Sequence, residues 1–287
     1  MDASINNQFS AELSANTNFS GGLYRKLLSA YAELPFVTME RIADISSPEL
    51  GELPLVFMRY APPSSTASRK LKLLITAGIH GDEPAGVLAL YKYVMSLSLR
   101  ELPVEVYAFP CINPVGLLQN SRASSGHFDL NRQMTRNSIA PEVRAFVSTL
   151  DGLCTPFDAA FDLQEDNPAV TRDTAPDGSE ADAFYLYESN FDPLRASIGT
   201  EISRAVAKAG IAVASQRSIY GERSLNGVIQ RGMERDREWD VERFLTMNVT
   251  NHAITLRTPV SAPLSERVKA QTTALESGIQ VLMRALL

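Results

Sequence analysis

Apolar positions along this chain repeat with two periods, one typical of strands and one typical of helices. Short apolar runs predict strands at 53–60, 71–76, 104–109, 157–163, 184–187, 211–214, 227–230 and 252–256. Helical spacing predicts helices at 84–97, 141–150 and 194–209. The C-terminal segment predicts the clearest helix, whose apolar face is made of Leu264, Val268, Leu275, Ile279, Leu282 and Leu286. This alternation indicates an α/β fold, with a mostly parallel or mixed central sheet between layers of helices.

Composition and charge narrow the picture. The 287 residues, 45% hydrophobic and 21% charged, suffice for one large α/β domain. No repeat or linker divides the chain, so we predict a single domain over 1–287, with 1–45 as an N-terminal elaboration of a core at 46–287. A net charge of −6 without a long basic run disfavours nucleic-acid binding. The absence of a signal-peptide pattern and of a long apolar stretch favours a cytoplasmic location.

The first segment with candidate chemistry lies at 77–86, between a predicted strand and a helix that starts at Pro84. It holds His80 and Glu83 three residues apart, so both side chains are expected to project from one turn at the carboxyl end of a strand. Ligand sites of open α/β sheets collect at that edge. An imidazole nitrogen and a carboxylate oxygen are also ligand types that Zn²⁺ accepts in catalytic sites.

The second segment follows the strand predicted at 104–109. Its turn sequence at 113–116 is expected to expose the loop that carries Arg122, Asn131 and Arg132. Each arginine has the geometry to hold a carboxylate through two hydrogen bonds, and the asparagine adds an amide donor. A surface loop with solvated arginines is an equally good interpretation of this spacing.

Two more segments end or form late strands. At 162–167 the acidic residues Glu165 and Asp166 follow Gln164, and such a concentration of like charge requires a cation, an arginine or solvent to offset it. The segment 251–259 begins at His252 and carries Arg257 near its end. A solvated acidic loop and a structural histidine are the alternative interpretations.

Taken in chain order, the four segments resemble the zinc metallocarboxypeptidases, the carboxypeptidase A-like group, and in particular its shorter bacterial members. The resemblance runs from about Leu71 to the C-terminal helix. It implies a three-layer fold around a mixed sheet of about eight strands. It also implies that His80 and Glu83 bind one zinc ion and that Arg122 stabilises an oxyanion. Substrate contacts are implied for Asn131, Arg132 and Tyr220, the last with a different spacing from the family.

Two positions depart from the family pattern. Gln164 stands where the family has its third zinc ligand, a histidine, and an amide oxygen is a poorer zinc donor than imidazole. Arg257 stands where the family has its general base, a glutamate, and arginine does not deprotonate in a protein. Either Gln164 ligates zinc weakly or an acidic neighbour replaces it. The guanidinium of Arg257 is expected to pair with Glu83, Glu165 or Asp166, where it would partly substitute for the cation.

Three functions follow from these residues. The first is a zinc-dependent hydrolase that cleaves a peptide or amide bond next to a free carboxylate, with Glu165 or Asp166 as the base. The second is a degenerate member that binds peptide or carboxylate ligands without turnover, through Arg122, Asn131, Arg132 and Arg257. The third is an amino-acid deacylase of the aspartoacylase and succinylglutamate desuccinylase type. The expected partner in each case is a peptide or N-acyl amino acid with a free carboxylate.

Overall fold

A mixed sheet of eight strands forms the centre of the computed structural model, in the order β1-β2-β4-β3-β5-β10-β6-β9. The structure describes residues 21–63, 69–98, 100, 102–153, 155–167, 180–192, 196–232 and 240–286. The strands of this sheet are β1 (Val37–Ser47), β2 (Gly51–Tyr60), β3 (Leu71–Ala77), β4 (Val104–Phe109), β5 (Ala159–Asp166), β6 (Tyr185–Asn190), β9 (Val228–Gln230) and β10 (His252–Pro259). The central strands β4, β3, β5 and β10 are parallel, whereas β1 is antiparallel to β2, β2 to β4 and β6 to β10.

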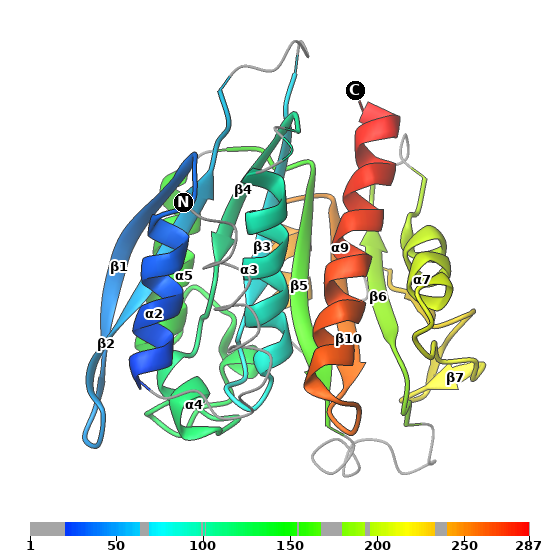
Figure 1. Cartoon of the computed structure of the whole chain (residues 1–287). Coiled ribbons are helices and arrows are strands. Elements are labelled where there is room, and N and C mark those ends of the chain that lie inside the picture. The colour runs from blue at the N-terminus through cyan, green and yellow to red at the C-terminus, as the bar shows by residue number, and fades with distance from the viewer. Residues whose placement is uncertain are drawn as a thin grey trace.

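Helices cover both faces of this sheet. Figure 1 shows α2 (Gly21–Ala32), α3 (Pro84–Ser98), α9 (Leu264–Leu286) and α7 (Gly199–Lys208) in front of the strands, with α5 (Pro141–Leu153) behind them. The short helix α8 (Val241–Asn248) shares the apolar core of the α5 face. The remaining elements are α4 (Pro114–Gln119), the 3₁₀ helix η1 (Leu130–Gln133) and the hairpin β7 (Ser218–Ile219) with β8 (Glu222–Arg223). The predicted single α/β domain is confirmed. No helix in the described part of the chain is long and apolar enough to span a membrane.

The apolar patterns of the sequence become the two cores. The predicted apolar face of α9 is buried at Leu264, Val268, Leu275, Ile279 and Leu282. These residues belong to the core between the sheet and α2, α3, α7 and α9. Aromatic rings dominate the opposite core, where those of Phe109 and Phe146 lie 4.5 Å apart. Burial of this area on both faces is the main favourable contribution to folding.

His252 lies at the start of β10, fully buried among structural partners. Its Nε2 lies 2.8 Å from the Oε1 atom of Glu188 on β6. The same carboxylate accepts hydrogen bonds from the N–H groups of Ile198 (2.7 Å) and Gly199 (2.9 Å) at the start of α7. Burial raises the pKa of Glu188, but these donors outweigh burial and leave the pKa below its ordinary value. Glu188 therefore joins β10, β6 and α7.

Three predictions at element boundaries differ from the structure. The strand predicted at 211–214 is wrong, because this segment makes only one isolated bridge between Phe184 and Val213 after the left-handed turn at Gly210. The helix predicted from 194 begins at Gly199, and part of the predicted start lies outside the described residues. Strand β5 continues through the acidic run to Asp166, because β10 pairs with it from Ala160 to Asp166. Strand β1, which spans residues 45 and 46, forms the edge of the sheet.

Two glycines, one in the turn after β3 and one in the first turn of α3, allow this segment to approach its neighbours closely. A Cβ atom on Gly81 would lie 1.9 Å from the backbone carbon of Gly116 in α4. A Cβ atom on Gly86 would lie 2.6 Å from the carbonyl oxygen of Leu163 in β5. Only glycine fits at such distances. The turn that holds His80 and Glu83 is thereby seated between α4 and the end of β5.

Candidate functional site

His80 lies at the centre of a buried group of charges at the carboxyl end of β3. Its side chain is fully buried, with Nδ1 2.7 Å from Oε1 of Glu83 and Nε2 3.2 Å from Oδ1 of Asp129. Asp129 caps η1, since its side chain also accepts a hydrogen bond from the N–H of Asn131. The loop after β4 is in this way joined to the turn after β3.

Arg122 covers the same pair from the solvent side. Its Nε donates a hydrogen bond of 3.1 Å to Oδ2 of Asp129. Its Nη1 donates one of 3.3 Å to Oε1 of Glu83 and lies 3.3 Å from Nδ1 of His80. Since 22% of the arginine side chain is exposed, one part of the guanidinium faces solvent while the rest neutralises buried carboxylates. We call His80, Glu83, Arg122 and Asp129, together with Arg257 described below, the central cluster.

Interactions among these charged groups outweigh the effect of burial on each pKa. Burial lowers the pKa of His80, but Glu83 and Asp129 outweigh burial and raise it above its ordinary value. Burial raises the pKa of Glu83, yet His80, Arg257 and Arg122 together lower it. Burial also acts against ionisation of Asp129, yet His80 and Arg122 hold its pKa well below the usual range. The two carboxylates therefore favour protonation of the imidazole.

Alternate residues of β5 project to opposite faces of the sheet. Asp162, Gln164 and Asp166 share the face of the α5 core, whereas Leu163 and Glu165 face α3 and α9. The Nε2 atom of Gln164 donates a 2.5 Å hydrogen bond to Oδ2 of Asp162, while its buried Oε1 atom has no hydrogen-bond partner. Burial raises the pKa of Asp162 to about 6, against the hydrogen bonds that this carboxylate accepts.

Arg257 lies beside Gln164 on the neighbouring strand β10. Its Nη1 donates a 2.9 Å hydrogen bond to the carbonyl oxygen of Glu165, and its buried Nε has no partner. Burial acts to lower the pKa of this guanidinium, but Tyr185, Glu83, Tyr187 and Asp166 hold it above the ordinary value. Arg257 thus supplies positive charge to carboxylates on two sides.

Glu165 joins the central cluster only through its main chain. Its N–H donates a 2.8 Å hydrogen bond to Oε2 of Glu83. Its side chain points to the other face, where it accepts a 2.8 Å hydrogen bond from the N–H of Ala85 and pairs with Arg267 of α9. Burial raises the pKa of Glu165 to about 7, opposed by Arg267 and by the N–H of Ala85. The structure does not bring this carboxylate to the predicted metal ligands.

Tyr220 reaches the end of β5 from the β7–β8 hairpin. Its hydroxyl donates a 2.7 Å hydrogen bond to Oδ2 of Asp166. The hairpin turn consists of Tyr220 and Gly221, whose φ angles are 49° and 78°. A positive φ is uncommon for a bulky side chain, and such conformations persist where neighbouring contacts hold them. The hydrogen bond to Asp166 is one such contact, and it holds the phenol at the end of β5.

One family model and several solved structures are similar to this chain. Residues 69–163 match the family model of the succinylglutamate desuccinylase/aspartoacylase catalytic domain. No curated protein matches the sequence of the chain. The matched segment runs from the start of β3 to β5 and includes His80, Glu83, Arg122 and Asp129.

Solved structures resemble almost the whole chain. A provisionally named metallopeptidase of Shewanella amazonensis SB2B superposes with a TM-score of 0.70 at 19% identity, over 91% of this chain and 92% of the other. A metallo-carboxypeptidase of Burkholderia cenocepacia gives a TM-score of 0.67 at 17% identity, over 94% of this chain and 70% of the other. A metallo-carboxypeptidase of Pseudomonas aeruginosa, in complex with (2-guanidinoethylmercapto)succinic acid, gives 0.63 at 16% identity, over 94% and 70%. The fold is carboxypeptidase-like.

In this carboxypeptidase-like fold, the residues at the predicted metal position do not fit zinc. Both carboxylate oxygens of Glu83 are engaged, one by His80 and Arg122 and the other by the N–H of Glu165. Gln164 offers one amide oxygen, a weak zinc donor, and Arg257 places a positive charge beside it. Among the described residues, no group of three His, Cys, Asp or Glu side chains is arranged to hold a metal ion.

The predicted substrate-binding pair is divided between two environments. The Oδ1 atom of Asn131, a buried residue, accepts a 3.0 Å hydrogen bond from the N–H of Val241 at the start of α8. Arg132 lies on η1 and is exposed. Asn131 therefore has a structural role at a helix start, while Arg132 faces solvent at the rim of the same loop.

Sequence reasoning did not select Asp129 and Arg267 as site residues. A histidine at a metal-type position usually donates a hydrogen bond from its second ring nitrogen to a carboxylate, so the sequence did contain a signal for Asp129. Asp129 directly precedes the pair of residues chosen from the same loop. No comparable signal exists for Arg267, which meets Glu165 across a separation of 102 residues.

Proposed function

We propose that the central cluster binds a small ligand through its carboxylate group, and that it does so without a metal ion. The observation that carries this proposal is the buried Nε of Arg257, an ionised donor without a partner. Buried polar groups are nearly always paired, so an orphaned donor of this kind marks a place where a ligand completes the hydrogen bonds. A carboxylate is the natural acceptor for a guanidinium because two parallel hydrogen bonds form.

Neighbouring atoms support the same ligand. The Oε1 atom of Gln164 and the Oγ1 atom of Thr255 are also buried without partners, on the same face as Arg257. Gln164 Oε1 accepts only, so it suits an N–H donor near the carboxylate. Arg122 adds a second guanidinium at the exposed side of the cluster. These groups suit an N-acyl amino acid or the carboxyl end of a peptide.

The comparisons favour this ligand class without deciding between binding and turnover. The Pseudomonas aeruginosa structure holds a succinic acid derivative, a compound with carboxylates. The matching family model belongs to desuccinylases and aspartoacylases, as its name states. A hydrolase is the second candidate function, favoured by the fold and by the positions of His80 and Glu83. It requires Gln164 to complete a zinc site that the present geometry disfavours.

The experiment compares N-acetylglycine with N-acetylglycinamide, which lacks the carboxylate, by isothermal titration calorimetry on protein treated with a chelator. We expect the acid to bind and the amide to bind at least about tenfold more weakly. Arg257→Met should abolish binding of the acid, whereas Arg223→Met, which removes an exposed arginine of β8, should not change it.

Two outcomes contradict the proposal. Equal affinity for acid and amide would exclude carboxylate recognition by Arg257. Stoichiometric zinc in the purified protein, measured by elemental mass spectrometry, together with chelator-sensitive hydrolysis of N-acetyl amino acids, would establish the second candidate instead.

A further inference from the structure

A cavity lies on the opposite face of the sheet from the central cluster. Its volume is about 270 Å³, and it is lined by the end of β10, by the first turns of α9 and by the segments that precede β6 and follow α7. Thr258 lines it, and the hydroxyl of Thr258 accepts a hydrogen bond from Gln271 of α9. Arg257, the neighbouring residue, therefore projects to the other face. Ligand pockets of drug size span about 300–1,000 Å³, so this cavity suits a compound with a single ring.

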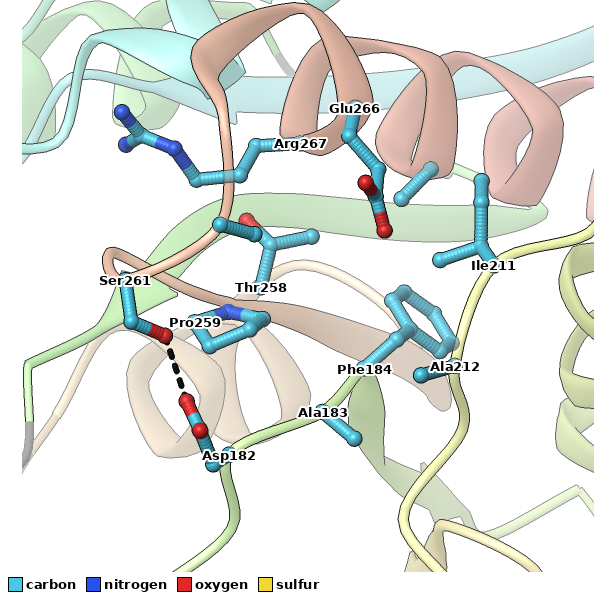
Figure 2. Close-up of a pocket in the computed structure, with 12 residues that line it drawn as sticks. Asp182, Ala183, Phe184, Ile211, Ala212, Thr258, Pro259, Ser261, Glu266 and Arg267 are labelled. Atoms are coloured by element: carbon cyan, nitrogen blue, oxygen red, sulfur yellow. Dashed lines mark hydrogen bonds between the residues drawn. The ribbon is translucent and has the colours of Figure 1, made fainter.

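One wall of this cavity is apolar. Phe184 lines it just before β6, Ile211 lines it from the segment after α7, and Ala270 lines it from α9. All three are at most 8% exposed and belong to the core of this face. Figure 2 shows the ring of Phe184 opposite α9, with Ile211 beside it. An aromatic or branched apolar group fits against this wall.

The polar groups of the cavity lie at two separated places. Glu266 reaches from α9 toward the middle of the cavity, and Arg267 leaves the helix in another direction (Figure 2). Consecutive helical residues do not face each other, which explains the divergence. Asp182 lies opposite and accepts a hydrogen bond from the hydroxyl of Ser261. The carboxylates of Glu266 and Asp182 make this region negative.

Arg267 contributes an unused donor. Its Nη1 pairs with Glu165, so its charge is already compensated inside the protein. Its Nε has no hydrogen-bond partner, although it is buried in a residue that is only 9% exposed and water cannot readily satisfy it. A neutral acceptor on a ligand would satisfy this N–H, whereas an anion would meet the two carboxylates.

We infer that this cavity is a second ligand site, which takes a small amine with an aromatic or branched apolar body and a neutral hydrogen-bond acceptor at its other end. The ammonium group pairs with Glu266, the apolar body lies on Phe184 and Ile211, and the acceptor receives the Nε–H of Arg267. The site is independent of the carboxylate proposed for the central cluster, since the two use different residues on different faces of the sheet.

Three related probes test the inference on the full chain by isothermal titration calorimetry. Tyramine has all three features, tyrosol replaces its amine with a hydroxyl, and phenethylamine lacks its phenol. We expect saturable binding of tyramine, with tyrosol at least about tenfold weaker and phenethylamine weaker by a smaller factor. Glu266→Gln should weaken tyramine about tenfold and remove its advantage over tyrosol. Glu276→Gln, on the same helix but outside the cavity, should leave tyramine binding unchanged.

A second variant fills the cavity. Ala270→Leu adds volume at a wall position of α9 and should abolish binding of all three probes, because their space is occupied. The inference is overturned if tyramine does not bind saturably, if tyrosol binds as well as tyramine, or if Glu266→Gln has no effect. Because Glu266→Gln is a near-isosteric change at a partly exposed position, it decides the matter even if Ala270→Leu fails to fold.

Discussion

The guanidinium of Arg257 stands among carboxylates, and its removal tests whether it acts as their resident cation. In Arg257→Met the 2.9 Å hydrogen bond to the carbonyl of Glu165 is lost, and a bond from a charged donor is worth about 1.5–3 kcal/mol. Glu83 and Asp166 also lose the positive charge that Arg257 provides. Breaking a buried charge arrangement costs about 3–5 kcal/mol, and partial exposure reduces this figure. We expect a total loss of about 3 kcal/mol.

The assay is equilibrium unfolding in urea, with the free energy of unfolding extrapolated to water. Arg223→Met serves as the matched control, because it makes the same change at an exposed position and should stay within about 0.5 kcal/mol of the parent. Arg257→Lys should fall between the two, since it keeps the charge without the planar guanidinium. A loss for Arg257→Met no larger than that of the control would refute the role of Arg257 as a compensating cation.

Three further changes have expected results. The double variant Gln164→His/Arg257→Glu should contain near-stoichiometric zinc, measured by elemental mass spectrometry, whereas the parent should contain none. A double variant without zinc would show that other groups block the site. Gly81→Ala should lose about 3 kcal/mol in thermal unfolding because its Cβ would meet the backbone of α4, whereas Gly152→Ala, with open space around it, should lose nothing. Glu188→Gln should be less stable than the parent at neutral pH. Because the pKa of Glu188 in the folded protein lies below 4.5, the difference in free energy of unfolding between parent and variant should persist above pH 4.5. In urea unfolding, this difference should close as the pH falls through the folded pKa.

Much of the fold was predictable because its signals are local. Strand β3, helix α3 and helix α9 each carry an apolar pattern of the correct period, and the structure buries those positions. His80 and Glu83 were predictable as a pair because three residues in one turn bring side chains together whatever the rest of the chain does. The strand predicted at 211–214 was wrong because a short apolar run does not specify strand pairing. Its neighbouring segment makes only one bridge with it, between Phe184 and Val213.

The acidic run of β5 shows where local reasoning stopped. The prediction from sequence ended this strand at 163 and therefore placed Gln164, Glu165 and Asp166 in one acidic turn. In the structure the strand continues, so its period of two residues sends Glu165 to the face of α9 and leaves Gln164 and Asp166 beside Arg257. The continuation depends on the parallel partner β10, which lies about 90 residues later in the chain.

The residue types along the chain decided which layers form and where His80 and Glu83 stand. They also put an amide at the position predicted for the third metal ligand and a guanidinium at the position predicted for the base. Tertiary structure alone decided which charges distant in the sequence meet. Asp129 reaches His80 across 49 residues, Arg267 reaches Glu165 across 102, and Tyr220 reaches Asp166 across 54. The period of apolar residues is a local pattern in the sequence, and it predicts which side chains of an element are buried. The pairing of charges depends on strand order and crossover, and these arise only when the whole sheet assembles.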